Sequence, residues 1–484
     1  MLDAVVVGSG PNGLAAAVTL ARAGLSVRVY EKGATIGGGA RTAELTLPGF
    51  HHDVCSAVHP MAYASPFFQR FRLHERIEFA IPPLSYAHPL DGARAGRAWI
   101  DLQRTADELG ADGEAWRSLF LPLLERTEDV SDFVSRSMLT IPRHPITLAR
   151  FGLRVLEQGS PAWNLRWKTA EAPAMLTGVF AHTIRPLPGL APAAAGLVLA
   201  LYAHAGGWPI PIGGSQAIVD ALAADAVAHR AEIVTDHEIS SLAELPRARA
   251  VILDTSAAGL QQIAGDRLPP AYARWLDRFH FGQAVAKVDF ALSGPVPWAA
   301  SDLAKTATLH LAGTRADIAR SERQVARGRH PDDPYVLVSQ PSQFDATRAP
   351  TGKHVLWAYT HVPRGSTLDR TEAITRQIER FAPGFRDLII ASSARTAVDL
   401  DNYNPNYVGG DIAAGDVNLR QLIARPVPSP DPWRTPVPGL YLCSASTPPG
   451  PGVHGLGGWR AALSALRHEF GYTKSPDLGP DNRK

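Results

Sequence analysis

The stretch VVVGSGPNGLAAAVTLARAGLSVRVYE, residues 5–31, decides the fold. Residues 3–7 form a short apolar run of mostly β-branched residues that ends at a glycine, which is typical of a buried parallel strand. Small helix formers fill residues 13–23, and Gly24 follows as a C-terminal glycine. Residues 26–32 then indicate a second strand. The stretch therefore predicts strand, glycine turn, helix and strand, a βαβ unit with a right-handed crossover.

Three glycines in the turn form the pattern G-x-G-x-x-G, namely Gly8, Gly10 and Gly13, and Glu31 lies about 20 residues further on. The first glycine permits the tight turn, the second lets a pyrophosphate approach the backbone, and the third lets the helix pack closely on the strand. The helix N-terminus offers N–H groups and positive dipole to the phosphates. Glu31 is expected to accept hydrogen bonds from the adenosine ribose. The pattern predicts a dinucleotide site and leaves NAD and FAD open.

A second glycine loop helps to decide between NAD and FAD. Gly37, Gly38 and Gly39 precede Arg41 and Thr42 in the stretch EKGATIGGGART. A glycine loop with a cation is well placed to close on the pyrophosphate from the other side, and such a second clamp suits a cofactor buried along its whole length. We therefore predict FAD. The alternative is a flexible loop with a solvated arginine.

Composition excludes several function classes. The chain has 484 residues, enough for two or three domains. Lys plus Arg (48) nearly equals Asp plus Glu (46), so no basic field indicates nucleic-acid binding. The only cysteines, Cys55 and Cys443, form no CxxC pair, which argues against a disulfide framework, a zinc site or a dithiol centre. No HExxH pair or other metal motif occurs, and we predict no metal.

The two regions that bear on location are the N-terminus and the most apolar later stretch. The first residues lack the basic segment and cleavage site of a signal peptide, so we expect a cytoplasmic protein. Residues 187–203 are too short to span a bilayer and contain Pro188 and Pro192. We interpret them as a buried helix; the alternative is a peripheral membrane patch.

The order of motifs predicts a discontinuous domain. Strand and helix patterns of the nucleotide-binding type occupy residues 1–80, 205–265 and 395–484. Residues 81–204 contain amphipathic helices of a cap or substrate segment, and 266–394 contain strand-like runs with an amphipathic helix. We expect two substrate segments inserted between three cofactor-binding segments.

Four stretches together resemble a known family: GSGPNGLAAAVTLARAG, EKGATIGGGART, PGFHHDVCSAVHP and GLYLCSASTPPGPGVHGLGGWRAA. They resemble the phytoene-dehydrogenase-like FAD oxidoreductases, which include carotenoid desaturases, carotenoid isomerases and retinol saturase. Within that family the chain is most similar to the branch of pyridine nucleotide-disulfide oxidoreductase domain-containing proteins. The resemblance implies an α/β fold: a Rossmann-type FAD-binding domain built from discontinuous segments, with an inserted α+β substrate domain.

The resemblance also implies which residues contact FAD, from the ADP half through the pyrophosphate to the isoalloxazine. These are Gly8, Gly10, Pro11, Asn12, Gly13, Glu31 and Lys32, then Gly38, Gly39, Arg41 and Thr42, and finally Ser446, Gly452, Val453, His454, Gly455 and Leu456. The sequence departs from the family at residues 53–56, DVCS in place of D-A-G-P, and at 447–452, TPPGPG in place of H-P-G-G-G. The first departure alters the local pocket, and the second moves the histidine to position 454.

Three side chains are candidates for acting on a substrate. His454 is expected in the turn beside the flavin, where it would act as a general acid/base or a hydrogen-bond partner, or simply pack the turn. His59 follows the second FAD segment and is expected to face the same cavity. Lys287 lies on a predicted strand; it would order water or substrate near the flavin, or extend to the surface. The polar turn from Asn404 to Asp411 is expected to return toward the flavin, although turn formation alone would explain it.

The leading hypothesis is an FAD-dependent oxidoreductase that desaturates or saturates a carbon–carbon bond of a lipophilic or conjugated substrate by hydride transfer. The first alternative is a redox-neutral double-bond isomerase that uses reduced FAD. The second is a non-catalytic carrier or scaffold on this fold, like the Rab GDP-dissociation inhibitors. The middle of the chain has no second G-x-G-x-x-G, which makes a dedicated NAD(P)H domain unexpected. The sequence leaves the electron acceptor and the oligomeric state open.

Overall fold

The first βαβ unit forms as the sequence predicts. In the computed structural model, which describes residues 2–481, α1 (Pro11–Arg22) connects β1 (Leu2–Val7) to β2 (Val27–Tyr30). The two strands pair in parallel, with Val7 opposite Tyr30. The glycine turn and Glu31 therefore lie at the same edge of the sheet, at the carboxyl ends of both strands.

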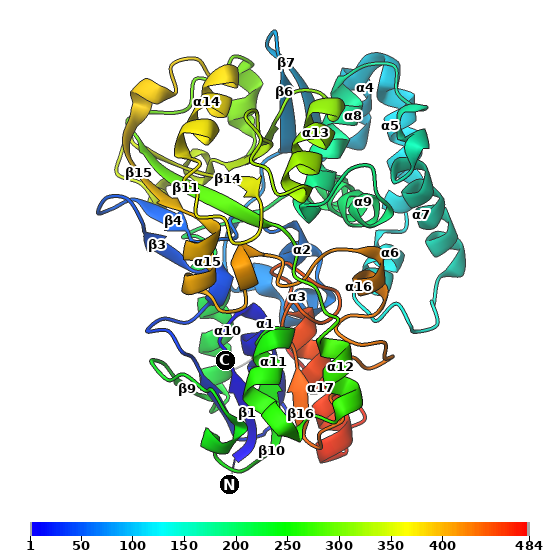
Figure 1. Ribbon diagram of the computed structural model, residues 1–484, viewed down its shortest axis with the longest axis vertical. Coiled ribbons are helices and arrows are strands. Elements are labelled where there is room, and N and C mark those ends of the chain that lie inside the picture. The colour runs from blue at the N-terminus through cyan, green and yellow to red at the C-terminus, as the bar shows by residue number, and fades with distance from the viewer. Residues whose placement is uncertain (1, 482–484) are drawn as a thin grey trace.

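The nucleotide-binding sheet is assembled from three distant parts of the chain (Figure 1). It is fully parallel and has the order β16-β10-β1-β2-β9. The strands added to β1 and β2 are β9 (Glu232–Val234), β10 (Ala248–Leu253) and β16 (Leu440–Leu442). The predicted discontinuous Rossmann-type domain is confirmed.

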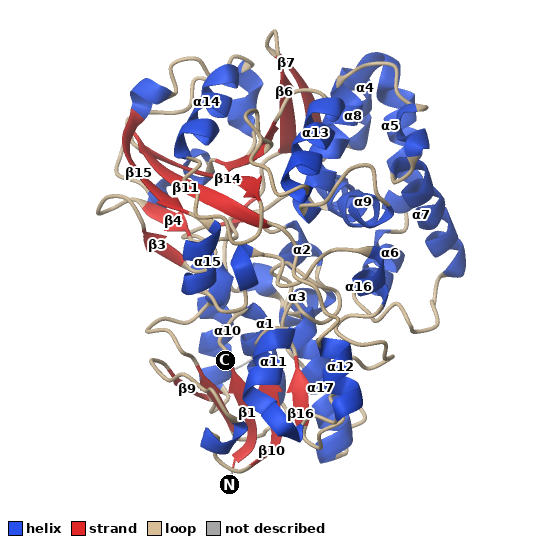
Figure 2. Cartoon of the chain, in the orientation of Figure 1, coloured by secondary structure: helices blue, strands red, loops and turns tan. Residues whose placement is uncertain are grey.

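Helices cover both faces of this sheet and complete three layers (Figure 2). One face packs on α1, α10 (Gln216–Ala228) and α17 (Leu456–Phe470), and the other on α11 (Ala257–Ala264) and α12 (Pro270–Leu276). Gly458 of α17 lies directly on the backbone of α1 at Asn12, where a Cβ would overlap the carbonyl oxygen. The α12 helix belongs to this core through Tyr272 and Leu276, so this part of the domain extends past the expected boundary at residue 265.

A second sheet of seven strands forms the core of the upper part of the molecule in Figure 1. We call this part the upper body and the nucleotide-binding domain the lower body. The order of the second sheet is β15-β11-β14-β13-β12-β6-β7, and it is mixed, because β6 pairs in parallel with β12 while the other pairs are antiparallel. Its strands are β6 (Leu84–Leu90), β7 (Arg94–Trp99), β11 (Ala284–Leu292), β12 (Thr308–Leu311), β13 (Val336–Ser339), β14 (His354–Val362) and β15 (Ile389–Arg395).

The two faces of the second sheet differ in chemistry. One face is aliphatic and packs on α14 (Thr371–Phe381), with Val288, Leu356 and Val338 facing Ile378. The opposite face carries polar and aromatic side chains toward the remaining helices of this body. These are α4 (Leu102–Leu109), α5 (Gly113–Leu124), α6 (Thr127–Val134), α7 (Pro145–Gln158), α8 (Glu171–Phe180), α9 (Leu190–Ala205) and α13 (Arg315–Ala326).

Short elements join the two bodies. They are the hairpin strands β3 (Thr42–Glu44) and β4 (His51–Asp53), the paired strands β5 (Phe79–Ala80) and β8 (Ile210–Pro211), and the helices α2 (Pro60–Ala64), α3 (Pro66–Phe71), α15 (Ala397–Tyr403) and α16 (Leu419–Ile423).

The apolar stretch at residues 187–203 is a core element. It forms α9, whose Leu197, Ala200 and Leu201 are fully buried against the sheet and its neighbouring helices. The alternative of a membrane patch at these residues is therefore wrong, because their apolar side chains already have protein neighbours. None of the helices formed by residues 2–481 combines the length and apolar character needed to cross a bilayer.

Candidate functional site

One cavity of about 640 Å³ lies between the two bodies. Its lining begins at the glycine turn and Glu31 and continues past the second glycine loop and the C-terminal Pro451–Val453 turn. It ends at the polar face of the seven-stranded sheet, at residues such as Trp357 and Tyr359. The volume is in the range of about 300–1,000 Å³ typical of cofactor and ligand pockets.

The glycine turn has no room for side chains. Gly8 has a φ of +98°, which favours glycine, and a Cβ on Gly10 would lie 2.7 Å from the Asp254 carboxylate. A Cβ on Gly13 would overlap the Gly8 carbonyl oxygen, so this glycine lets α1 pack against the end of β1. The turn thus presents backbone to the cavity, as the sequence predicts for a phosphate-binding turn.

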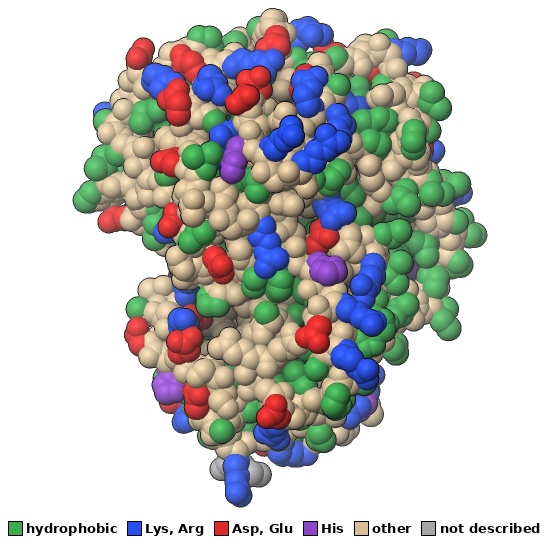
Figure 3. Space-filling view, viewed as in Figure 1, with side chains coloured by type: hydrophobic (Ala, Val, Ile, Leu, Met, Phe, Trp, Pro, Cys, Tyr) green, Lys and Arg blue, Asp and Glu red, His purple; other side chains and the backbone are tan. Residues whose placement is uncertain are grey.

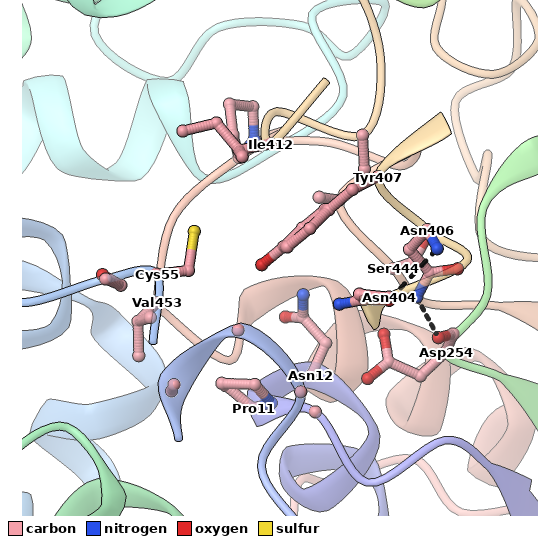
Figure 4. A pocket seen from close by; sticks show the side chains of 18 of the residues that line it. Pro11, Asn12, Cys55, Asp254, Asn404, Asn406, Tyr407, Ile412, Ser444 and Val453 are labelled. Atoms are coloured by element: carbon pink, nitrogen blue, oxygen red, sulfur yellow. Dashed lines mark hydrogen bonds between the residues drawn. The ribbon is translucent and has the colours of Figure 1, made fainter. Parts of the chain in front are cut away.

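Asp254 is a site residue that our sequence analysis missed. It ends β10 beside the glycine turn, and its Oδ2 accepts a hydrogen bond of 2.9 Å from the Gly13 N–H. Its backbone oxygen accepts a bond of 3.0 Å from Asn406, drawn as a dashed line in Figure 4. Burial, together with the nearby Glu31 carboxylate, raises the pKa of Asp254 to about 7. The signal was an acidic residue at the end of an apolar strand, the same pattern that identified Glu31.

Glu31 is held rigidly at the edge of the cavity. Its Oε2 accepts the Ser9 N–H at 3.0 Å and the Ser9 hydroxyl, and its Oε1 accepts the Gly33 N–H at 2.8 Å. Arg41 reaches back to the same carboxylate at 3.2 Å and also donates to the Tyr403 hydroxyl. The second glycine loop is thereby tied to the first, and both line the same end of the cavity.

The second glycine loop packs against the C-terminal segment. A Cβ on Gly39 would overlap the Tyr407 hydroxyl. Figure 4 shows Tyr407 and Cys55 pointing into the same space beside Pro11 and Asn12. The polar turn around Asn404 and Asn406 therefore does return to the cavity, as expected.

Most of the predicted cofactor residues line the cavity, and the others lie behind the wall. The lining contains Gly8, Gly10, Pro11, Asn12, Glu31, Lys32, Gly38, Gly39, Arg41, Gly452 and Val453. Outside it lie Gly13, Thr42, Ser446, His454, Gly455 and Leu456.

Two of these outlying residues hold supporting hydrogen bonds. The Thr42 hydroxyl donates to Asp53 at 2.7 Å and accepts the Gln216 N–H at 3.2 Å. The Ser446 hydroxyl accepts the Ala257 N–H and donates to a backbone carbonyl. These side chains therefore join segments of the domain and do not face the ligand space.

His454 lies inside the turn that precedes α17. Its Nε2 contacts the Gly450 carbonyl at 3.1 Å, and its Nδ1 accepts the Leu456 N–H at 3.1 Å. Burial lowers its pKa to about 4, so the ring is neutral. Because backbone groups engage both ring nitrogens, the structure places His454 as a residue that shapes the turn, and neither nitrogen is left for a substrate.

His59 lines the cavity, but its ring is also engaged. Its Nε2 lies 2.7 Å from the Ser215 hydroxyl, and its Nδ1 lies 3.5 Å from Ser56. Burial lowers its pKa to about 4. The neutral ring therefore links the cavity wall to the segment that precedes α10.

Lys287 is not at the surface, in contrast to one of our interpretations. It is buried on β11, forms an ion pair with Asp289, and has its Nζ 5.5 Å from the centre of the Trp357 ring. Burial lowers its pKa and raises that of Asp289. The lysine lies opposite Tyr359, on the same face of the sheet as Trp357; both aromatic residues line the cavity, and Lys287 is not itself in the lining.

A family model for the NAD(P)-binding Rossmann-like domain matches residues 6–71. The chain is 26% identical to pyridine nucleotide-disulfide oxidoreductase domain-containing protein 2 of Rattus norvegicus, over 96% of this chain and 93% of that protein. It is 29% identical to the 4,4'-diapolycopen-4-al dehydrogenase of Metabacillus indicus, but over only 25% of this chain and 26% of that protein. The resemblance to the first branch thus extends along the whole chain, and the resemblance to phytoene-dehydrogenase-like proteins covers a quarter of it.

Among solved structures, a putrescine oxidase superposes with a TM-score of 0.60 at 16% sequence identity, over 97% of this chain and 99% of that one. The likeness agrees with the strand order of the first sheet and with the cavity between the two bodies. The chain therefore has a Rossmann-type dinucleotide-binding domain with an inserted α+β domain, the fold of oxidoreductases such as putrescine oxidase.

Proposed function

We propose that this protein is an FAD-dependent oxidoreductase that transfers hydride to or from a lipophilic substrate, in a desaturation or saturation of a carbon–carbon bond. The observation that carries the proposal is the single cavity that runs from Glu31 and the glycine turn to the wall of the second sheet. A nicotinamide site of the simple βαβ type needs no second glycine loop and no C-terminal turn along its length. Here the Gly38–Arg41 loop and the Pro451–Val453 turn both line the cavity.

The residues present fit FAD. The side-chain-free turn at Gly8 and Gly10 would receive the pyrophosphate at the N-terminus of α1, and Glu31 would accept the ribose hydroxyls. Two buried polar atoms along the cavity wall, Asn12 Oδ1 and Thr255 Oγ1, have no hydrogen-bond partner within residues 2–481. When bound, FAD supplies the hydride chemistry. The chain's part is to bind the cofactor, orient the substrate and exclude water.

The lipophilic substrate is supported by the far end of the cavity. Ile184, Leu199, Trp208, Leu337 and Tyr359 line it there, and all but Leu199 are at least nine-tenths buried. The similarity to phytoene-dehydrogenase-like proteins, although partial, favours the same substrate class. Anaerobic mixing of the oxidised and of the reduced protein with candidate lipids separates the two enzyme hypotheses. Bleaching of the oxidised flavin, or return of colour to the reduced flavin, supports net hydride transfer, whereas product formation on reduced flavin without a change of colour supports isomerisation.

Glu31→Gln is expected to weaken FAD binding roughly tenfold, because a hydrogen bond to a charged acceptor is worth about 1.5–3 kcal/mol and one to the neutral amide about 0.5–1.5 kcal/mol. The control is Glu232→Gln on β9, which removes an exposed carboxylate paired with Arg28 and should leave FAD affinity unchanged. Titration of the flavin-free protein with FAD, followed by fluorescence, measures both. Wild-type protein that is colourless and takes up no FAD would contradict the proposed function.

We propose in addition that the chain contacts an anionic membrane surface through α7. Ile146 and Leu153 on this helix are 71% and 64% exposed, and Leu156 continues the stripe one turn later. Ile141 and Leu165 flank it and are also strongly exposed. Figure 3 shows hydrophobic side chains gathered along the right edge of the molecule, where Figure 1 places α7. Residues 129–168 contain six Arg or Lys against three acidic residues, and four of the six arginines and lysines pair with Asp132 or Glu157. The remaining excess of positive charge favours acidic lipid headgroups.

The double change Ile146→Asp and Leu153→Asp is expected to lower sedimentation with vesicles of phosphatidylglycerol and phosphatidylcholine at least tenfold, because burying each aliphatic side chain is worth about 1.5–3 kcal/mol. Ile390→Asp is the control, since this exposed isoleucine lies on β15, on the opposite side in Figure 1. Wild-type protein that ignores vesicles but elutes as a dimer, with the dimer lost in the double variant, would assign α7 to self-association instead.

A further inference from the structure

The polar face of the seven-stranded sheet carries a row of side chains at the far wall of the cavity. Strand register places Thr308 of β12 opposite Ser339 of β13, and Ser339 opposite Trp357 of β14. Side chains directly opposite one another lie on the same face of a sheet. All three residues line the cavity. We call Thr308, Ser339 and Trp357 the polar row.

The polar row is buried without hydrogen-bond partners. The three residues are 2%, 1% and 5% exposed. Thr308 Oγ1, Ser339 Oγ and Trp357 Nε1 all lack a partner within the part of the chain that the structure describes. Buried polar groups in native proteins are nearly always paired, so three adjacent exceptions require an explanation. The opposite face of the same strands carries Leu309, Val338 and Leu356, which shows that aliphatic residues fit this sheet.

The chemistry of the polar row selects an uncharged oxygen. The Trp357 indole only donates, and the two hydroxyls donate or accept, so together they suit a carbonyl or hydroxyl oxygen. The lining residues that share a core cluster or an aromatic contact with Trp357 and Trp208 include Ile184, Leu199, Leu337, Tyr359 and His182, and none of these carries a carboxylate, ammonium or guanidinium group.

The nearby charges are matched within the protein. Lys287 lies on β11, on the same face of the sheet as Trp357, and is paired with Asp289. His182 shares a hydrogen bond of 2.8 Å with His310. A carboxylate or an ammonium group at the polar row would therefore be buried without a counter-charge, which is strongly unfavourable.

We propose that the polar row binds the uncharged oxygen-bearing end of an otherwise apolar substrate, such as the carbonyl of an aldehyde or ketone or the hydroxyl of an alcohol. This inference rests on the proposed function and narrows its substrate class. A pure hydrocarbon leaves the polar row unpaired, and amines and carboxylates are disfavoured. Leu199, Leu337 and Tyr359 contact the apolar part that follows the oxygen.

The test compares ligands of equal chain length with the flavin-loaded protein. Dodecanal, dodecanol, dodecylamine and dodecanoate are delivered from cyclodextrin at pH 8, and binding is followed by the change in the flavin spectrum and by the melting temperature. We expect dodecanal and dodecanol to bind at least tenfold more tightly than the two charged ligands. Equal or tighter binding of dodecylamine or dodecanoate would overturn the assignment.

Two variants test the polar row itself. Thr308→Val and Ser339→Ala are each expected to weaken dodecanal binding roughly 3- to 10-fold, the loss of one hydrogen bond, and to leave the melting temperature of the ligand-free protein unchanged or higher, because each removes an unpaired buried hydroxyl. Thr360→Val is the matched control on β14. Its hydroxyl donates to the Tyr335 carbonyl at 2.7 Å, so this variant should melt earlier and keep dodecanal affinity.

Three results would overturn the assignment. A lower melting temperature with unchanged ligand affinity in Thr308→Val would make the polar row structural. A loss of flavin from either variant would show that the polar row binds the cofactor and not the substrate. Failure of the wild-type protein to bind any of the neutral ligands, although it holds FAD, would remove the substrate class while leaving the flavoprotein proposal intact. Conversely, selective aldehyde binding by a protein that never exchanges hydride would support the ligand assignment of the polar row and contradict the proposed oxidoreductase function.

Discussion

Gly39→Ala is expected to lower the affinity for FAD at least tenfold, and Tyr407→Phe in the same chain is expected to restore most of it. The new methyl group would overlap the Tyr407 hydroxyl, and the next nearest ring atom of Tyr407 is 3.3 Å away. Overpacking of this kind costs about 1–3 kcal/mol and moves the residues involved. Gly39 and Tyr407 both line the cavity, so the displacement falls where the second glycine loop meets the C-terminal segment.

The measurement is a double-mutant cycle with FAD titration of wild type, the two single variants and the double variant. The phenylalanine removes the overlapping oxygen and keeps the ring, so the two changes should be strongly non-additive. Additive effects, with the double variant weaker than either single variant, would show that Gly39 matters for backbone freedom alone and that its packing on Tyr407 is unimportant.

Asp254→Asn is expected to stabilise the protein strongly at pH 8 and much less at pH 5. The folded pKa of about 7 exceeds the ordinary value of 3.8, so the folded state holds a proton between these values that the unfolded state has released. The contribution of Asp254 to stability therefore declines as pH rises from about 4 to 7 and stays low above pH 7. The full difference corresponds to roughly 4 kcal/mol, which the neutral amide avoids while its oxygen still accepts the Gly13 N–H.

Thermal unfolding of wild type and Asp254→Asn between pH 5 and pH 8 checks this expectation. The control is Asp3→Asn on the same sheet, because hydrogen bonds from Ser26 lower the pKa of Asp3 and predict a loss of stability at neutral pH. The same Asp254 variant should bind FAD more tightly at pH 8, since it removes a negative charge from the phosphate turn. A pH-independent effect of Asp254→Asn would contradict the raised pKa.

The first βαβ unit of the dinucleotide-binding domain could be predicted from the sequence, because its signals are local. The residues from β1 to Glu31 contain a strand, a turn, a helix and an acidic residue within 30 positions. Each of these can be recognised from the residue types of a few neighbouring positions. Gly39 and Arg41 were found for the same reason. Their relation to Tyr407 was not, because the packing of residues 39 and 407 depends on tertiary structure that no local pattern encodes.

The polar row could not be predicted from the sequence. Thr308 and Ser339 occur in ordinary strand sequences, and only the pairing of β12 with β13 and β14 aligns them with Trp357. The orientation of the His454 ring could not be predicted for a different reason. The family resemblance implied a flavin contact, yet the ring nitrogens bond to backbone groups only two and four residues away. Residue type and position gave the neighbourhood of this histidine but not the orientation of its ring.

The order of strands in the first sheet also has a consequence for synthesis on the ribosome. The neighbours of β1 include β10, which begins at residue 248, and the sheet ends with β16 at residue 440. The ribosome adds roughly 5–20 residues per second, so β16 is synthesised on the order of a minute after β1. During that time the apolar strand β1 is available to chaperones and to mispairing. A nascent chain that stops before residue 451 lacks the Pro451–Val453 part of the cavity wall.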